Sequence, residues 1–197
     1  MMLRLATIAV TLLLVAATPT LAQDFVLGVH SGGTHTRQLL RSGYSGFESG
    51  STLGLAGTMT IKPWLALSVE ILVVDKGRLP TQPNPHKYFE VPYMLRFSSP
   101  WQLAGIRPYA SYGAAYAYEL SCDTGCANAQ RVTTDFSVVS AWGTTFTWNR
   151  FELALEQRRT RGQTTMNRLT QFHATNDMRS LLLRLSFVIP GVVPDWL

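Results

Sequence analysis

Residues 134–158 read TDFSVVSAWGTTFTWNRFELALEQR, two alternating runs joined by a very short turn. In the second run, apolar residues share one parity and polar or small residues share the other: Phe151, Leu153 and Leu155 against Glu152, Ala154, Glu156 and Arg158. Because successive side chains of a β-strand point to opposite faces, this alternation predicts a strand.

The run from Asp135 to Trp148 has the same alternation. Its large residues fall on one parity, namely Phe136, Val138, Trp142, Phe146 and Trp148. Asn149 and Arg150 then predict a tight hairpin between two long strands. The apolar face of such a hairpin would point to the core of a soluble sandwich but to the lipid around a membrane barrel, so the rest of the sequence has to separate the two interpretations.

The N-terminus predicts export. Residues 1–22 contain one charged side chain, Arg4, then an apolar run from Leu5 to Ala17 and small residues before Gln23. The apolar run is shorter than the roughly 20 residues that cross a bilayer as a helix. We therefore expect a secretory signal peptide cleaved after Ala22, with a retained N-terminal anchor as the alternative.

The remaining chain, Gln23 to Leu197, has the length of one domain. The formal net charge of the whole sequence is +5, but no polybasic run is present, so we expect no nucleic-acid partner. In an oxidising compartment Cys122 and Cys126 predict a local disulfide. A metal site would need further ligands close to these cysteines, and the nearest histidines, His86 and His173, are far away in the sequence.

Alternation predicts eight strands in all. They are Phe25–Thr34, Gly50–Ile61, Leu65–Asp75, Tyr88–Phe97, Arg107–Leu120, Asp135–Trp148, Phe151–Arg158 and Asn176–Phe187. Pro92 lies within the fourth of these strands, where it predicts a bulge or a locally missing hydrogen bond.

The predicted connections alternate in length. The long ones are His35–Ser49, Lys76–Lys87, Ser121–Thr133 and Thr160–Thr175, and the shorter ones are Lys62–Trp64, Ser98–Ile106 and Asn149–Arg150. An outer-membrane barrel has long extracellular loops and short periplasmic turns, whereas a soluble sandwich has no reason to sort its loops in this way. The pattern predicts an all-β fold, an eight-stranded antiparallel up-and-down transmembrane barrel in the bacterial outer membrane.

Charged residues in the predicted strands lie on the parity opposite the apolar rows. They are Glu70, Glu90, Arg96, Glu152, Glu156, Arg158 and Arg184. If the apolar rows face lipid, these groups meet inside a narrow barrel, where unpaired charges are costly. We therefore expect a connected ion-pair network that plugs the interior. The alternative is that these charges are solvated on the outside of a soluble barrel.

Six aromatic residues are available near strand ends as candidates for the membrane interface: Trp64, Tyr93, Trp101, Tyr109, Trp142 and Trp148. Some of the tryptophans fit a protein core equally well.

Several segments resemble the outer-membrane β-barrel domain family that is often called porin-like or PorT-like. They are the glycine-rich first strand, Ser68–Leu72 running into Lys76–Gly77, Tyr88–Tyr93 and Arg107–Gly113. The resemblance spans essentially the whole mature chain, and its most specific part is the pairing of the Glu90-Val91-Pro92 strand with the Glu70 strand. It implies an eight-stranded membrane barrel and says little about activity.

The C-terminus departs from the usual pattern of such barrels, which end on an aromatic residue that the barrel assembly machinery recognises. Phe187 fits that place, but residues 188–197 follow it. Two prolines exclude this tail from the sheet, so we expect a periplasmic tail.

Three classes of function fit the sequence. The first is a monomeric structural or adhesion barrel whose four outer loops contact an extracellular or envelope ligand. The second is a narrow channel for small solutes. The third is a soluble periplasmic carrier of a small apolar ligand, as in lipocalins. The candidate bases His30, His35, His86 and His173 stand in no hydrolase motif, so we expect neither an enzyme nor a cofactor.

Overall fold

The computed structural model describes residues 24–40, 43–44, 48–75, 87–121, 134–162 and 175–191. Its strands are β1 (Phe25–Leu40), β2 (Gly43–Tyr44), β3 (Glu48–Lys62), β4 (Leu65–Asp75), β5 (Lys87–Ser98), β6 (Ile106–Ser121), β7 (Thr134–Trp148), β8 (Phe151–Gly162) and β9 (Thr175–Ile189). Within these ranges no helix is long and apolar enough to cross a membrane.

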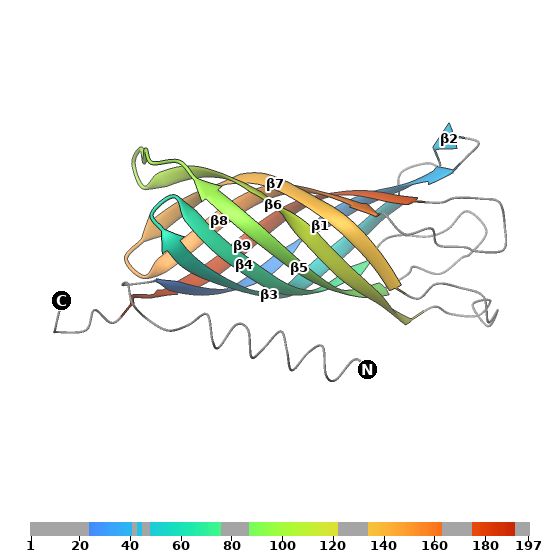
Figure 1. The fold of residues 1–197 in the computed structure, drawn as a ribbon, viewed down its shortest axis with the longest axis horizontal. Coiled ribbons are helices and arrows are strands. Elements are labelled where there is room, and N and C mark those ends of the chain that lie inside the picture. The colour runs from blue at the N-terminus through green and yellow to red at the C-terminus, as the bar shows by residue number, and fades with distance from the viewer. Residues whose placement is uncertain are drawn as a thin grey trace.

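The strands form one antiparallel meander that closes on itself (Figure 1). Each strand from β3 to β8 pairs with the next strand in the chain, and β1 pairs with both β3 and β9. The two-residue β2 pairs only with the end of β1, so the other strands form an eight-stranded barrel. This confirms the predicted fold class.

The apolar residues of the barrel lie on its outer surface. Leu53, Leu153 and Leu183 are 64%, 43% and 51% exposed, whereas the interior side chains of Glu70 and Arg184 are at most 1% exposed. A soluble barrel has the opposite arrangement, because burial of apolar surface from water drives its folding. An apolar exterior of this kind belongs in the outer membrane, so the soluble lipocalin-like carrier is excluded.

Short turns lie at one end of the barrel, which we call the turn end. Asn149–Arg150 joins β7 to β8, and the register Trp148↔Phe151 makes it the tight hairpin that the sequence predicts. Asn149 has a φ of 54°, a left-handed conformation that asparagine tolerates better than most residues. The other end, where the long connections begin and end, is the loop end. Long connections at one end are typical of the extracellular side of outer-membrane barrels.

The strand bounds differ from the prediction mainly at the loop end. Residues 35–40 and 160–162, predicted to be loop, continue β1 and β8, and Glu48 already belongs to β3. Beyond the apolar band both faces of a strand are polar, so the alternation disappears although the backbone pairing continues, for example at His35↔Arg179. At the other end β9 runs on to Ile189, so the tail begins two residues later than predicted.

Pro92 interrupts one side of its strand. The β4–β5 register passes from Val69↔Tyr93 directly to Leu72↔Glu90 without a shift, whereas on the other side Pro92 pairs with Ala115. Proline has no N–H to donate, which accounts for the missing pairs next to β4, as predicted.

Some predictions concern residues outside the described ranges. These are the leader (residues 1–22), the Cys122–Cys126 disulfide, most of the four long loops, and the tail from residue 192.

Candidate functional site

All seven charged residues singled out from the sequence lie on the inner wall of the barrel. Glu70 comes from β4, Glu90 and Arg96 from β5, Glu152, Glu156 and Arg158 from β8, and Arg184 from β9. Six of them are fully buried, and the side chain of Glu152 is 15% exposed. The parity of each strand alone places these groups inside.

Arg158 is the centre of the first cluster. Its Nη1 lies 2.7 Å from Oε2 of Glu70, and its Nη2 lies 2.6 Å from Oε1 of Glu156. In the closed order of strands, β4 and β8 are separated by three strands in either direction, so the bond to Glu70 spans the lumen. On the far side of Glu70, Nε2 of His30 on β1 lies 3.5 Å from Oε1.

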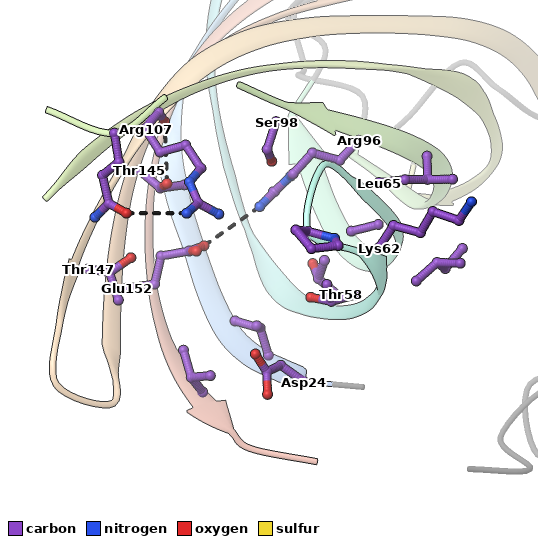
Figure 2. Close-up of a pocket in the computed structure, with 17 residues that line it drawn as sticks. Asp24, Thr58, Lys62, Leu65, Arg96, Ser98, Arg107, Thr145, Thr147 and Glu152 are labelled. Atoms are coloured by element: carbon purple, nitrogen blue, oxygen red, sulfur yellow. Dashed lines mark hydrogen bonds and ion pairs between the residues drawn. The ribbon is translucent and has the colours of Figure 1, made fainter. Parts of the chain in front are cut away.

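Glu152 is the centre of the second cluster, nearer the turn end. Nη2 of Arg184 donates to its Oε1 at 2.8 Å. Nη1 of Arg96 lies 3.6 Å from the same oxygen (Figure 2). Tyr109 joins the two clusters, because its hydroxyl donates to Glu156 at 2.8 Å and its ring stacks 4.2 Å from the Arg96 guanidinium. Six of the seven charged residues, all except Glu90, thus form one continuous chain of contacts with His30 and Tyr109, from His30 to Arg184. Such contacts are what buried charges require, since each loses its hydration.

Apolar side chains occupy the interior on the loop-end side of this chain. Along β4 the inward positions change from Ser68 and Glu70 to Leu72 and Val74, and the last two pack against Met178 of β9. Met94, Ala115 and Val139 form a second buried group. Three apolar side chains, Leu72, Val74 and Met178, therefore lie between the Arg158–Glu70 ion pair and the loop end, beside the buried Glu90, which is directly opposite Leu72.

A cavity of about 750 Å³ lies inside the barrel on the other side, toward the turn end (Figure 2). Its wall includes the cations Lys62, Arg96 and Arg107 and the carboxylates Asp24 and Glu152. Arg107 donates to Oε1 of Gln102 at 3.2 Å. Within the described ranges no group of three His, Cys, Asp or Glu residues is placed to hold a metal ion. The cavity is a charged vestibule that ends at the Arg96–Glu152 ion pair.

The prediction of an interface position was wrong for one aromatic residue. Tyr109 is 5% exposed and points into the barrel, because it shares the inward parity of Arg107 and Ser111 on β6. The other five, Trp64, Tyr93, Trp101, Trp142 and Trp148, are 42–83% exposed on the outer surface.

Sequence reasoning also missed two interior residues of the network, His30 and Tyr109. His30 alternates with the apolar Leu27 and Val29 of the first strand, so its parity was the signal that could have found it. Another histidine, His35, lies on the exposed surface at the loop end, where its Nδ1 is 3.2 Å from the Ser49 hydroxyl. No carboxylate in the described ranges contacts the second ring nitrogen of His35.

No protein-family model matches the chain, and no curated protein matches it. Solved structures do match. Neisserial surface protein A aligns with 82% of this chain and 97% of its own, at 14% identity and a TM-score of 0.55. The N-terminal β-barrel domain of Pseudomonas aeruginosa OprF covers 81% of this chain and 97% of its own, at 10% identity and a TM-score of 0.47.

Ail, the attachment invasion locus protein of Yersinia pestis, solved with the heparin analogue sucrose octasulfate, covers 83% of this chain and 99% of its own. The identity is 12% and the TM-score 0.47. At such identities the likeness concerns the fold alone, and the likeness to Neisserial surface protein A agrees with the outer-membrane barrel that the chain forms. The narrower resemblance to PorT-like proteins stays a prediction from the sequence.

Proposed function

We propose that this outer-membrane barrel has a closed lumen and serves a structural or adhesion role, with its contacts made by the connections at the loop end. The observation that carries the proposal is the ion pair of Arg158 with Glu70, which joins opposite walls of the barrel. The buried side chains of Leu72, Val74 and Met178 lie between that ion pair and the loop end. To pass through the lumen, a hydrated ion would have to displace both the ion pair and these apolar side chains.

A narrow channel for small solutes is the second candidate, favoured by the charged vestibule at the turn end. The two are separated by conductance in planar bilayers, with insertion verified on the same sample by the heat-dependent gel shift of folded barrels. We expect no ohmic steps from the protein. A variant in which Glu70, Glu156, Arg158, Leu72, Val74 and Met178 are all replaced by serine removes both obstacles and serves as the open comparison. Regular steps from the unaltered protein would contradict the closed lumen.

We also propose that the barrel is not a hydrolase and needs no cofactor. A hydrolase that uses a side-chain nucleophile requires that nucleophile to be hydrogen-bonded to a base. A further group on the other side of the base orients it. His30 is 1% exposed, so no substrate reaches it, and the His35–Ser49 pair lacks an orienting carboxylate among the described residues. Turnover of soluble or lipid esters that disappears in Ser49→Ala would contradict this proposal.

For assembly we propose a monomer inserted by the barrel assembly machinery. Two observations support it. The barrel closes within one chain through β1 and β9, and Phe187 stands near the end of β9, exposed on the lipid-facing side. Light scattering of the refolded protein in detergent is expected to give the mass of one chain, and a stable dimer mass would contradict the monomer.

A further inference from the structure

The outward-facing side chains of β8, β9 and β1 include arginines near the loop end, beyond the apolar rows. On β9 the outward residues Leu181, Leu183, Leu185 and Phe187 are apolar, and the next outward position is Arg179. On β8 the outward row continues past Leu155 and Gln157 to Arg159 and Arg161, and on β1 it includes Arg37. We call Arg37, Arg159, Arg161 and Arg179 the arginine patch.

Strand pairing gathers these arginines from three strands. Arg179 lies directly opposite Arg159, and Asp177 lies between Arg37 on one side and Arg161 on the other. Three of the four face outward from neighbouring positions on β8 and β9, where side chains directly opposite each other are close enough to interact. Like charges so close repel, so the arrangement needs anions to stabilise it.

Asp177 supplies one such anion and orients two of the guanidiniums. Arg159 donates to it with Nε and Nη2, both at 2.9 Å, and Arg37 donates from Nη2 at 2.9 Å. The Arg159 side chain is nonetheless 45% exposed. Arg179, also exposed, makes no ion pair with any residue that the structure describes. Among the residues that the structure describes, the four cations of the patch are paired with one carboxylate, Asp177, so this part of the surface has a net positive charge.

A surface cavity of about 190 Å³ adjoins the patch. Its lining includes Arg159 and Arg179 together with Ser140, Gln157 and Trp142. Trp142 is 64% exposed and belongs to the lipid-facing row of β7, which continues past it to Phe136, 49% exposed. The cavity therefore has guanidinium groups on one side and a lipid-facing aromatic wall on the other, at the border between the apolar band and the polar loop end.

We propose that the arginine patch and this cavity bind a phosphate group of a phosphorylated lipid in the outer leaflet. Guanidinium groups match phosphate oxygens with paired hydrogen bonds, and arginine is suited to such planar recognition. A lipid phosphate lies just outside the hydrocarbon, which is the level of Arg159 and Arg179. The acyl chains of the same lipid then run along the apolar rows of β7, β8 and β9. In the outer leaflet of a bacterial outer membrane, the phosphorylated glycolipid lipid A has this chemistry.

The test uses the full mature chain refolded in a zwitterionic detergent and titrated with diphosphoryl lipid A, with bound lipid counted by native mass spectrometry. Two further arms identify the source of the phosphate: dephosphorylated lipid A with the same acyl chains, and inorganic phosphate as a competitor. We expect tight binding of the diphosphoryl form, much weaker binding of the dephosphorylated form, and no competition by equimolar phosphate.

Variants test whether the arginine patch is the part of the surface that binds the lipid. Arg179→Gln is expected to weaken binding roughly fivefold and Arg159→Gln/Arg179→Gln roughly 25-fold, as for one or two arginines removed from an anionic surface. Because Arg179 makes no described ion pair, its single variant keeps the test valid if the double variant refolds poorly. The matched control is Lys87→Gln/Arg150→Gln, which removes the same charge elsewhere and is expected to bind like the unaltered protein.

Equal binding of the two lipid A forms would overturn the proposal, and so would equal loss in the control and patch variants. Displacement of the lipid by equimolar inorganic phosphate would instead show a site for free phosphate, which also overturns it.

Discussion

Replacement of Arg158 by methionine is the perturbation that probes the interior most directly. Methionine keeps most of the volume of the side chain and removes its charge, so Glu70 and Glu156 stay buried without their common cation. Removal of one partner from a buried ion pair costs about 3–5 kcal/mol. Because His30 stays near Glu70 and Tyr109 still donates to Glu156, we expect the lower part of that range, about 3 kcal/mol.

The matched control is the next residue of the same strand. Arg159 faces outward and is 45% exposed, and Asp177 keeps its bonds to Arg37 when Arg159 is replaced. Arg159→Met should therefore lower the free energy of unfolding by less than about 1 kcal/mol, as for other exposed ion pairs. The assay is urea unfolding of barrels folded into lipid vesicles, followed by tryptophan fluorescence, with the free energy obtained by linear extrapolation.

A further variant separates lost pairing from lost packing. If Glu70→Gln and Glu156→Gln are added to Arg158→Met, no uncompensated charge remains at the centre, and much of the stability should return. The reasoning is refuted if Arg158→Met unfolds within about 1 kcal/mol of Arg159→Met, or if neutralising the two carboxylates makes the Arg158→Met barrel less stable still.

Three other predictions use the same protein. Leu183→Arg places a charge on the lipid-facing side of β9 and should destabilise the folded barrel by about 2–4 kcal/mol, measured by the same unfolding assay, and no loss of stability would contradict lipid contact there. Cys122 and Cys126 should resist a thiol reagent until a reductant is added, and rapid labelling of the unreduced protein would exclude the disulfide. Intact mass of the protein from the membrane fraction should correspond to a chain that begins at Gln23, and a mass that includes Met1 would exclude cleavage after Ala22.

The strands that cross the apolar band could be predicted almost to the residue. Leu65–Asp75 is identical in the prediction and in β4, because one apolar row faces lipid along its whole length. The extension of β1 through Arg37 could not be predicted, since beyond the band neither face is apolar and only the pairing with β9 keeps the strand extended. Alternation of apolar and polar residues indicates which face of a strand is apolar. It therefore gives no signal where both faces are polar.

The sequence predicts which charged residues belong to the candidate site, but it does not predict which of them contact one another. Parity along a strand places Glu70 and Arg158 inside the barrel. Their ion pair depends on closure of the sheet, which brings β4 and β8 to opposite walls at the same height, and no local pattern encodes that height. The position of Tyr109 near a strand end indicates the membrane interface, whereas its parity, shared with Arg107 and Ser111, correctly indicates the barrel interior.

The central claim is that the apolar rows face lipid, and nitroxide scanning along β8 tests it most directly. Single cysteines, introduced at residues 151, 153, 155 and 159 in a chain without Cys122 and Cys126, carry the spin label in refolded vesicles. Collision with oxygen, which concentrates in the bilayer, is compared with collision with a water-soluble nickel chelate. The account predicts that oxygen dominates at Leu153 and Leu155 and that the nickel chelate gains at Arg159. Dominance of the nickel chelate at Leu153 would contradict it.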